Sequence, residues 1–211
     1  MVLGGNSDVR AVMFDMGGVI VDLDMNRCLD AFYTRAGFMT IRDIIDTCHP
    51  QGFFAQYEMG LMSDDEMYEE CIRRSRPGTT PDVIRECLET LLTGIDRNKA
   101  QLLHRLSERC DMYMLSNNNP IALDYCSKLF DDAGIPLDRI FRHLFCSYRM
   151  HVSKPSAEFF RQVFDNIGLD PSQTVFVDDS PKNVAAAADF GIDARLYVPG
   201  TDLSEVLQPV W

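Results

Sequence analysis

Polar side chains with chemical potential lie at or shortly after the ends of four apolar runs of the chain. They are Asp15, Ser116 with Asn117, Lys154, and Asp178 with Asp179. Carboxylates can bind a divalent cation or act as nucleophiles, and a hydroxyl, an amide and a lysine can hold an anion. If the fold brings these groups together, they combine a cation site with a phosphate site.

The first apolar run, residues 11–14, ends directly at Asp15, and Gly17 and Gly18 follow. A continuous apolar run bounded by glycine is typical of a strand buried on both faces. Glycines let the chain turn sharply and bring its backbone close to a ligand. Asp15 is therefore either a reactive carboxylate at a strand end or an ordinary turn residue, and the rest of the chain has to decide.

The elements that position these groups alternate regularly along most of the chain. We expect strands at residues 11–14, 112–115, 144–147, 174–177 and 195–198, and helices at residues 97–109, 121–133, 156–167 and 181–190. Such alternation predicts an α/β fold with a doubly wound, Rossmann-like parallel sheet. The carboxyl ends of parallel strands share one edge, where ligands bind, so the polar groups should converge there.

Residues 24–96 interrupt this alternation. After a short β extension at residues 19–21, no strand-like run is apparent before residue 97, and helices are expected at residues 27–36, 41–47, 53–59, 64–74 and 81–92. Ser63 and Glu66 have the spacing of a capping box. This block is too long for a single crossover. We therefore predict an inserted helical cap at residues 24–96 and a catalytic core made of residues 1–23 and 97–211.

The residue types favour phosphoryl chemistry. Three carboxylates held together repel one another, and a cation relieves the repulsion. Oxygen ligands of this kind suit Mg²⁺. A carboxylate beside a metal-bound phosphate can attack phosphorus and form an aspartyl-phosphate. Each residue also has a simpler interpretation: Asp179 and Ser116 as helix caps, and Lys154 and Asn183 as solvent-facing side chains.

Composition limits the partners. The net charge of −12 argues against nucleic acid and anionic membranes, but it allows a small phosphorylated metabolite. The seven cysteines show no pairing pattern, which favours a reduced cytoplasm. No stretch is long and apolar enough to cross a membrane. The oligomeric state is left open.

Four motifs, in order, resemble those of the haloacid dehalogenase-like hydrolase superfamily over about residues 9–198. They are Phe14-Asp15-Met16-Gly17-Gly18-Val19, Leu115-Ser116-Asn117, Lys154-Pro155, and Val177-Asp178-Asp179-Ser180 with Asn183. The helical block resembles the family's cap, and Tyr57-Glu58-Met59-Gly60 is similar to cap sequence of the same branch. Among its members, the chain most resembles capped bacterial sugar-phosphatases of the glucose-1-phosphate phosphatase type.

This resemblance implies a role for each motif. Asp15 is expected to be the nucleophile, and Ser116, Asn117 and Lys154 are expected to hold the phosphoryl oxygens. Mg²⁺ is expected on Asp15, Asp179 and the Gly17 carbonyl. Asp178 is expected to reach the metal, directly or through water, or to orient Lys154. Asn183 is expected to hold a metal-bound water. The cap is expected to select the leaving group.

Gly17 departs from the family pattern, in which most phosphatases carry a general-acid aspartate two residues after the nucleophile. Sugar phosphate hydrolysis remains the preferred prediction. Metal-independent haloacid dehalogenation is the enzymatic alternative, although adjacent Asp178 and Asp179 would repel a carboxylate substrate. A weakly active or inactive relative that binds a phosphorylated ligand is the other alternative. A response-regulator receiver domain fits less well, because it carries its acidic pair after the first strand and its lysine after the last.

Overall fold

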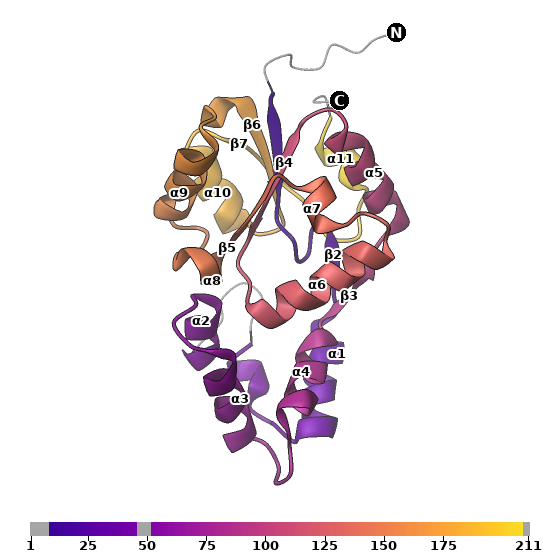
Figure 1. Cartoon of the computed structure of the whole chain (residues 1–211), viewed down its shortest axis with the longest axis vertical. Coiled ribbons are helices and arrows are strands. Elements are labelled where there is room, and N and C mark those ends of the chain that lie inside the picture. Colours follow the sequence, from indigo (N-terminus) through magenta and orange to yellow (C-terminus); the bar gives the residue numbers. More distant parts are fainter. Residues whose placement is uncertain (1–8, 46–51, 209–211) are drawn as a thin grey trace.

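A parallel sheet forms the centre of the protein. The structure, a computed structural model, describes residues 9–45 and 52–208. Five strands lie in the order β5-β4-β1-β6-β7, and every neighbouring pair is parallel (Figure 1). Their bounds are β1 Ala11–Phe14, β4 Asp111–Ser116, β5 His143–Cys146, β6 Thr174–Asp178 and β7 Asp193–Leu196. This order confirms the predicted doubly wound α/β fold.

Helices cover both faces of the sheet because successive strand residues point to opposite sides. Val12 and Phe14 pack on one side with α5 (Arg97–Ser107), α6 (Pro120–Asp132), α7 (Leu137–Ile140) and α11 (Leu203–Val206). Ala11 and Met13 pack on the other with α9 (Ala157–Ile167) and α10 (Pro181–Asp189). Both faces of β1 are thus buried, as its uninterrupted apolar sequence requires.

The cap, here the helical segment 24–91, lies beyond the carboxyl edge of the sheet (Figure 1). It contains α1 Met25–Ala31, a π-helical turn at Phe32–Ala36, a 3₁₀ turn at Ile41–Asp43, α2 Gly52–Glu58, α3 Asp64–Arg73 and α4 Pro81–Glu89. Its buried side chains, including Phe32, Phe38 and Met67, form a second hydrophobic cluster together with Ile121 at the start of the following core helix. The capping box is present: Ser63 Oγ accepts from the Glu66 N–H, and the Glu66 carboxylate accepts from the Ser63 N–H at 2.8 Å.

A two-stranded antiparallel ribbon joins the cap to the sheet domain. Its strands are β2 (Val21–Leu23) and β3 (Leu92–Ile95). The prediction that no strand lies between residues 24 and 96 is therefore wrong. Only Leu92 of β3 is buried, and Gly94 interrupts the strand, so β3 has no apolar pattern and depends on β2 for its hydrogen bonds. The predicted extension at residues 19–21 is likewise displaced to β2.

Other predicted bounds shift by a few residues. Helix 81–92 ends at Glu89, the strand at 195–198 lies at 193–196, and helix 27–36 is divided between α1 and the π-helical turn. Within the predicted helix 41–47, residues 41–43 form a 3₁₀ turn, and residues 46 and 47 lie outside the described residues. The short helices α7, α8 (Ser147–Met150) and α11 were not predicted. Four residues are too few to show a helical period.

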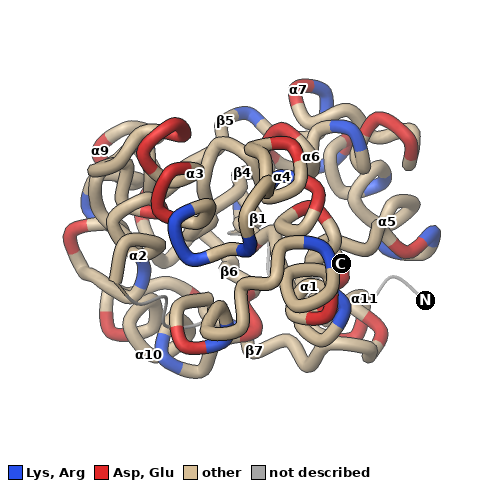
Figure 2. Tube along the Cα trace, turned by 90° about the horizontal axis from the view of Figure 1, so that it is seen from below, with Lys and Arg blue, Asp and Glu red and all other residues tan. Residues whose placement is uncertain are grey.

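Charge is distributed over the surface. Figure 2, which views the molecule from the cap end, shows acidic and basic residues interspersed over the helices. Within residues 9–45 and 52–208, no helix has the length and apolarity needed to cross a bilayer. Six cysteines fall in the same ranges, and all are free thiols.

Candidate active site

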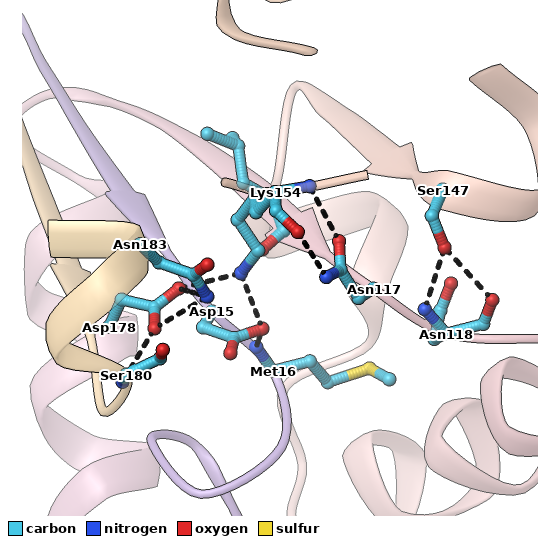
Figure 3. Close-up of polar contacts among 10 residues, drawn as sticks. Asp15, Met16, Asn117, Asn118, Ser147, Lys154, Asp178, Ser180 and Asn183 are labelled. Atoms are coloured by element: carbon cyan, nitrogen blue, oxygen red, sulfur yellow. Dashed lines mark hydrogen bonds and ion pairs between the residues drawn. The ribbon is translucent and has the colours of Figure 1, made fainter. Parts of the chain in front are cut away.

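The carboxyl edge of the sheet brings a buried lysine into contact with two carboxylates. Lys154 Nζ lies 3.0 Å from Asp15 Oδ1 and 2.7 Å from Asp178 Oδ2, and it donates to the Leu115 carbonyl at 2.7 Å (Figure 3). These contacts use all three ammonium protons. The lysine side chain is 1% exposed and that of Asp15 is 13% exposed, so Asp15 is the more accessible of the two.

Three carboxylates converge at this edge. Ligand atoms of Asp15, Asp178 and Asp179 all lie within 4.8 Å of one another. Burial raises the pKa of Asp15 to about 7, with Lys154 opposing the change and Asp178 and Asp179 adding to it. Burial, followed by the charge of Asp178, also raises the pKa of Asp179. The acids therefore repel one another in the absence of a further cation, and their hard oxygen atoms fit Mg²⁺.

Lys154 stays charged despite its burial. Burial lowers the pKa of its ammonium group, but the charges of Asp15 and Asp178 outweigh that effect, so the pKa is raised. The lysine is thus a fixed positive charge beside Asp15.

Asp178 and Asn183 hold the lysine in place through a chain of hydrogen bonds. Asp178 is fully buried, and Oδ1 accepts from the Ser180 N–H at 2.8 Å. Asn183 Nδ2 lies 3.0 and 3.1 Å from the two carboxylate oxygens. Asp178 is therefore held against Lys154 on its buried side, which favours the orienting role for it. The amide of Asn183 holds Asp178 rather than facing solvent.

The side chain of Asn117 is directed at the protein backbone. Its Nδ2 donates to the Lys154 carbonyl at 2.8 Å, and its Oδ1 accepts from the Lys154 N–H at 2.9 Å (Figure 3). This reciprocal pair fixes the loop that carries the lysine. The geometry thus favours a positioning function for the side chain, in place of the phosphate contact expected from the sequence.

A cavity of about 120 Å³ lies between these residues and the cap. Asp15, Ser116, Lys154 and Asp179 line it from the core. The cap and the ribbon contribute mainly apolar side chains and two carboxylates. These residues are Leu23, Ile45, Phe54, Glu58, Leu88, Glu89, Leu91 and Leu92. Ser116, at the end of β4, is 2% exposed, and Gly17 also lines the cavity.

Glu58 lines this cavity and Ser147 contacts the backbone of Glu58, although neither was a candidate site residue. Glu58 occurs in the Tyr57–Gly60 segment, which was interpreted only as cap sequence. Ser147 follows β5, whose carboxyl end lies on the same edge, and that position was an available signal. Its hydroxyl donates to the Glu58 carbonyl at 2.6 Å and accepts from the Asn118 N–H at 3.0 Å (Figure 3 shows the second contact).

Comparisons with known proteins agree with this geometry. The family model described as haloacid dehalogenase-like hydrolase matches residues 9–191. A D-ribitol-5-phosphate phosphatase from Bacteroides thetaiotaomicron is 28% identical over 94% of this chain and 97% of its own length. A chloroplast flavin mononucleotide hydrolase from Arabidopsis thaliana is 22% identical over 93% of this chain and 75% of its own length.

Solved structures give the same result. A wild-type HAD family enzyme from B. thetaiotaomicron, in complex with magnesium and inorganic phosphate, superposes with a TM-score of 0.87 at 29% identity. The match covers 95% of this chain and all of that one. An L-2-haloacid dehalogenase from Xanthobacter autotrophicus shares the fold, with a TM-score of 0.62 at 20% identity over 96% of this chain and 82% of its own. On the family match, the chain belongs to the haloacid dehalogenase-like hydrolases.

Proposed function

We propose that this protein is a Mg²⁺-dependent phosphatase that hydrolyses a small sugar or polyol phosphate through a phospho-Asp15 intermediate. The observation that carries the proposal is the convergence of three carboxylates and one buried lysine beside a cavity. Magnesium complexes of a structural relative and the phosphatase activity named for a sequence relative support it. Haloacid dehalogenation is compatible with the fold, but as a metal-independent reaction it provides no divalent cation to offset the three carboxylates.

In the proposed reaction, Asp15 attacks phosphorus while Ser116 holds a phosphoryl oxygen and the positive charge of Lys154 stabilises the phosphoryl group. Asp15, Asp179 and the Gly17 carbonyl would hold Mg²⁺, which supplies charge neutralisation for the phosphoryl group when bound. Asp178 and Asn183 keep the lysine in place, and Asn117 fixes its loop. Water then hydrolyses the acyl phosphate and returns Asp15 to its free form.

The charges of the cavity favour a neutral leaving group. Among the described residues that line it, Lys154 is the one cation, and its protons are already engaged. A second anionic group on the substrate would find no further cation among these residues, and it would lie near Glu89. Hydroxyl groups, in contrast, can bond to carboxyl and amide side chains. A neutral sugar or polyol phosphate meets these conditions, and the substrate named for the ribitol phosphatase is of this kind.

The domain division and the cellular location also remain proposals. Residues 1–23 and 97–211 would form the catalytic core and residues 24–96 the cap, with β3 inside the cap range. The free thiols are compatible with the cytoplasm. An acidic surface favours a small metabolite over nucleic acid as the partner.

Removal of Mg²⁺ tests the proposed function. Phosphate release from a panel including ribitol 5-phosphate and glucose 1-phosphate is expected in Mg²⁺, to be lost in EDTA, and to return when Mg²⁺ is restored. Ca²⁺, which prefers longer bonds and more ligands, is expected to restore little activity. Negligible release from every phosphomonoester would contradict the proposal, and chloride release from a haloacid in EDTA would favour dehalogenation.

Gly18 gives a second test of the metal site. Its φ is +80°, and a Cβ there would lie 2.2 Å from Asp179 Oδ2. Gly134 has a similar φ of +74°, but its Cβ would meet nothing within 4 Å. Both alanine variants should lose about 1 kcal/mol of unfolding free energy to backbone strain. Only Gly18→Ala also displaces Asp179, so it should lose the stabilisation by Mg²⁺ that Gly134→Ala retains.

Urea unfolding with and without Mg²⁺ measures both effects. Ligand binding to the native state adds stability that increases with the logarithm of affinity, so the Mg²⁺-dependent increment reports the metal site directly. Equal Mg²⁺ increments in the two variants would argue against Asp179 as a ligand.

A further inference from the structure

Among the described residues on the core side of the cavity, none is a free acid that could protonate the leaving oxygen. An alkoxide leaves phosphorus slowly unless it is protonated as the bond breaks. Gly17 has no side chain, Lys154 has all its protons engaged, and the proposed function commits Asp15 and Asp179 to attack and to the metal. The proton donor should therefore come from the other wall.

That wall is the cap. Asp15 attacks from the sheet edge, and in-line displacement sends the leaving oxygen away from Asp15. Because the cap lies beyond the carboxyl edge of the sheet, the leaving oxygen faces the cap side of the cavity (Figure 1). Among the described cap residues lining the cavity, the ionisable ones are Glu58 and Glu89.

Glu58 is the cap residue whose backbone the core holds in position. Its carbonyl accepts the Ser147 hydroxyl proton at 2.6 Å, and the same oxygen of Ser147 accepts from the backbone of Asn118. The following turn is held as well, because His151 Nδ1 lies 3.0 Å from the Met59 carbonyl. At Gly60, with φ +66°, a Cβ would lie 2.0 Å from the Tyr148 carbonyl, so the backbones pack directly.

We propose that Glu58 is the general acid that protonates the leaving oxygen, an inference that rests on the proposed phosphatase function. Glu58 thereby supplies from the cap the proton donor that Gly17, which has no side chain, cannot provide. Glu89 lines the same cavity from the end of α4, but among the described residues no hydrogen bond of this kind ties its backbone to the core.

The protonation state of Glu58 agrees with this role. Burial raises the pKa of its carboxyl to about 8, so the group keeps its proton at neutral pH. The charged groups that share its cavity are Asp15, Lys154, Asp179 and Glu89, and His151 contacts the next residue along the chain. No cation on the cap side of the described cavity stabilises the ionised form.

The step balances as follows. As Asp15 Oδ forms its bond to phosphorus, the bond to the ester oxygen breaks and Glu58 transfers its proton to that oxygen, which releases the alcohol. Glu58 is then a carboxylate, and it accepts a proton from the water that attacks the phospho-aspartate. Inorganic phosphate leaves, and both carboxyl groups return to their initial states.

Leaving-group dependence tests the assignment. Ribitol 5-phosphate releases an alcohol and needs protonation, whereas p-nitrophenyl phosphate releases a stable phenolate and does not. Glu58→Gln keeps the shape and removes the acid, so it should lower kcat/KM, which covers the steps up to formation of phospho-Asp15, by about 10²-fold for the alkyl ester and by less than about 3-fold for the aryl ester. Glu89→Gln is the matched control, and its alkyl-to-aryl ratio should stay within about twofold of the wild type.

The wild type is assayed first, so that failure of the proposed function is seen separately as absent Mg²⁺-dependent turnover of both esters. With that activity present, an equal loss of kcat/KM on both esters in Glu58→Gln would overturn the inference. A rise in KM alone on the alkyl ester would overturn it as well, since it would indicate recognition of a hydroxyl. The alkaline fall of kcat on the alkyl ester should be absent for the aryl ester, and a shared alkaline limb would count against Glu58.

Discussion

Asp15→Asn is expected to lower phosphatase activity by about 10⁴- to 10⁶-fold, the range seen when an enzyme loses its nucleophile. An amide oxygen does not attack phosphorus at a useful rate, and no other described carboxylate of the site is free to replace it. Asp178 is fully buried against Lys154 and Asn183. Asp179 follows β6 rather than β1, and the proposed function commits it to Mg²⁺.

The loss should occur in a folded protein. An asparagine Oδ1 can still accept from the Met16 N–H, now at 2.7 Å from Asp15 Oδ1, and Lys154 keeps its bonds to Asp178 and Leu115. One fewer carboxylate should also reduce the stabilisation that Mg²⁺ adds in thermal unfolding. Asp165→Asn, at an exposed position of α9, is the matched control.

Two measurements decide the prediction. Single-turnover assays give the chemical rate, and intact mass after rapid acid quenching gives the phosphorylated fraction of the wild type. The variant should show neither turnover nor a phosphate adduct. More than a tenth of wild-type activity in a folded Asp15→Asn protein would remove Asp15 from the nucleophilic role.

The core of the fold was predictable because its sequence pattern and its burial agree. Residues 11–14 and 175–177 are apolar without interruption, and both strands are buried in the sheet. Parallel strand order follows from the alternation with helices, and it brings strand-end residues to one edge. The convergence of Asp15, Asp178 and Asp179 was therefore predictable from the strand topology alone.

Side-chain partners were not predictable in the same way. Asn117 is adjacent to Ser116 in sequence, yet its amide pairs with the backbone of Lys154, 37 residues away. Glu58 and Ser147 meet across 89 residues, at a contact between cap and core that depends on how two independently packed clusters dock. Periodicity describes which face of an element is buried, but it carries no information about such a contact.

Lys154→Met is expected to have the largest effect on stability, a loss of about 3–5 kcal/mol, because it leaves a buried carboxylate without its partner. Asp178 is fully buried and would keep only the Asn183 and Ser180 donors, and the Leu115 carbonyl would lose its donor. Lys128→Met is the surface control. Lys128 pairs with Asp124 on α6, both side chains are more than half exposed, and such pairs contribute about 0–1 kcal/mol.

A double-mutant cycle separates the structural role of Lys154 from its catalytic one. Asp178→Asn removes the charge that Lys154→Met would otherwise leave buried, so the double variant should recover much of the lost unfolding free energy. Activity should not recover with it, because the positive charge beside the phosphoryl group is still absent. Recovery of both would reduce Lys154 to a structural counter-ion, and recovery of neither would mean that packing of the lysine stem, rather than its charge, holds the sheet edge together.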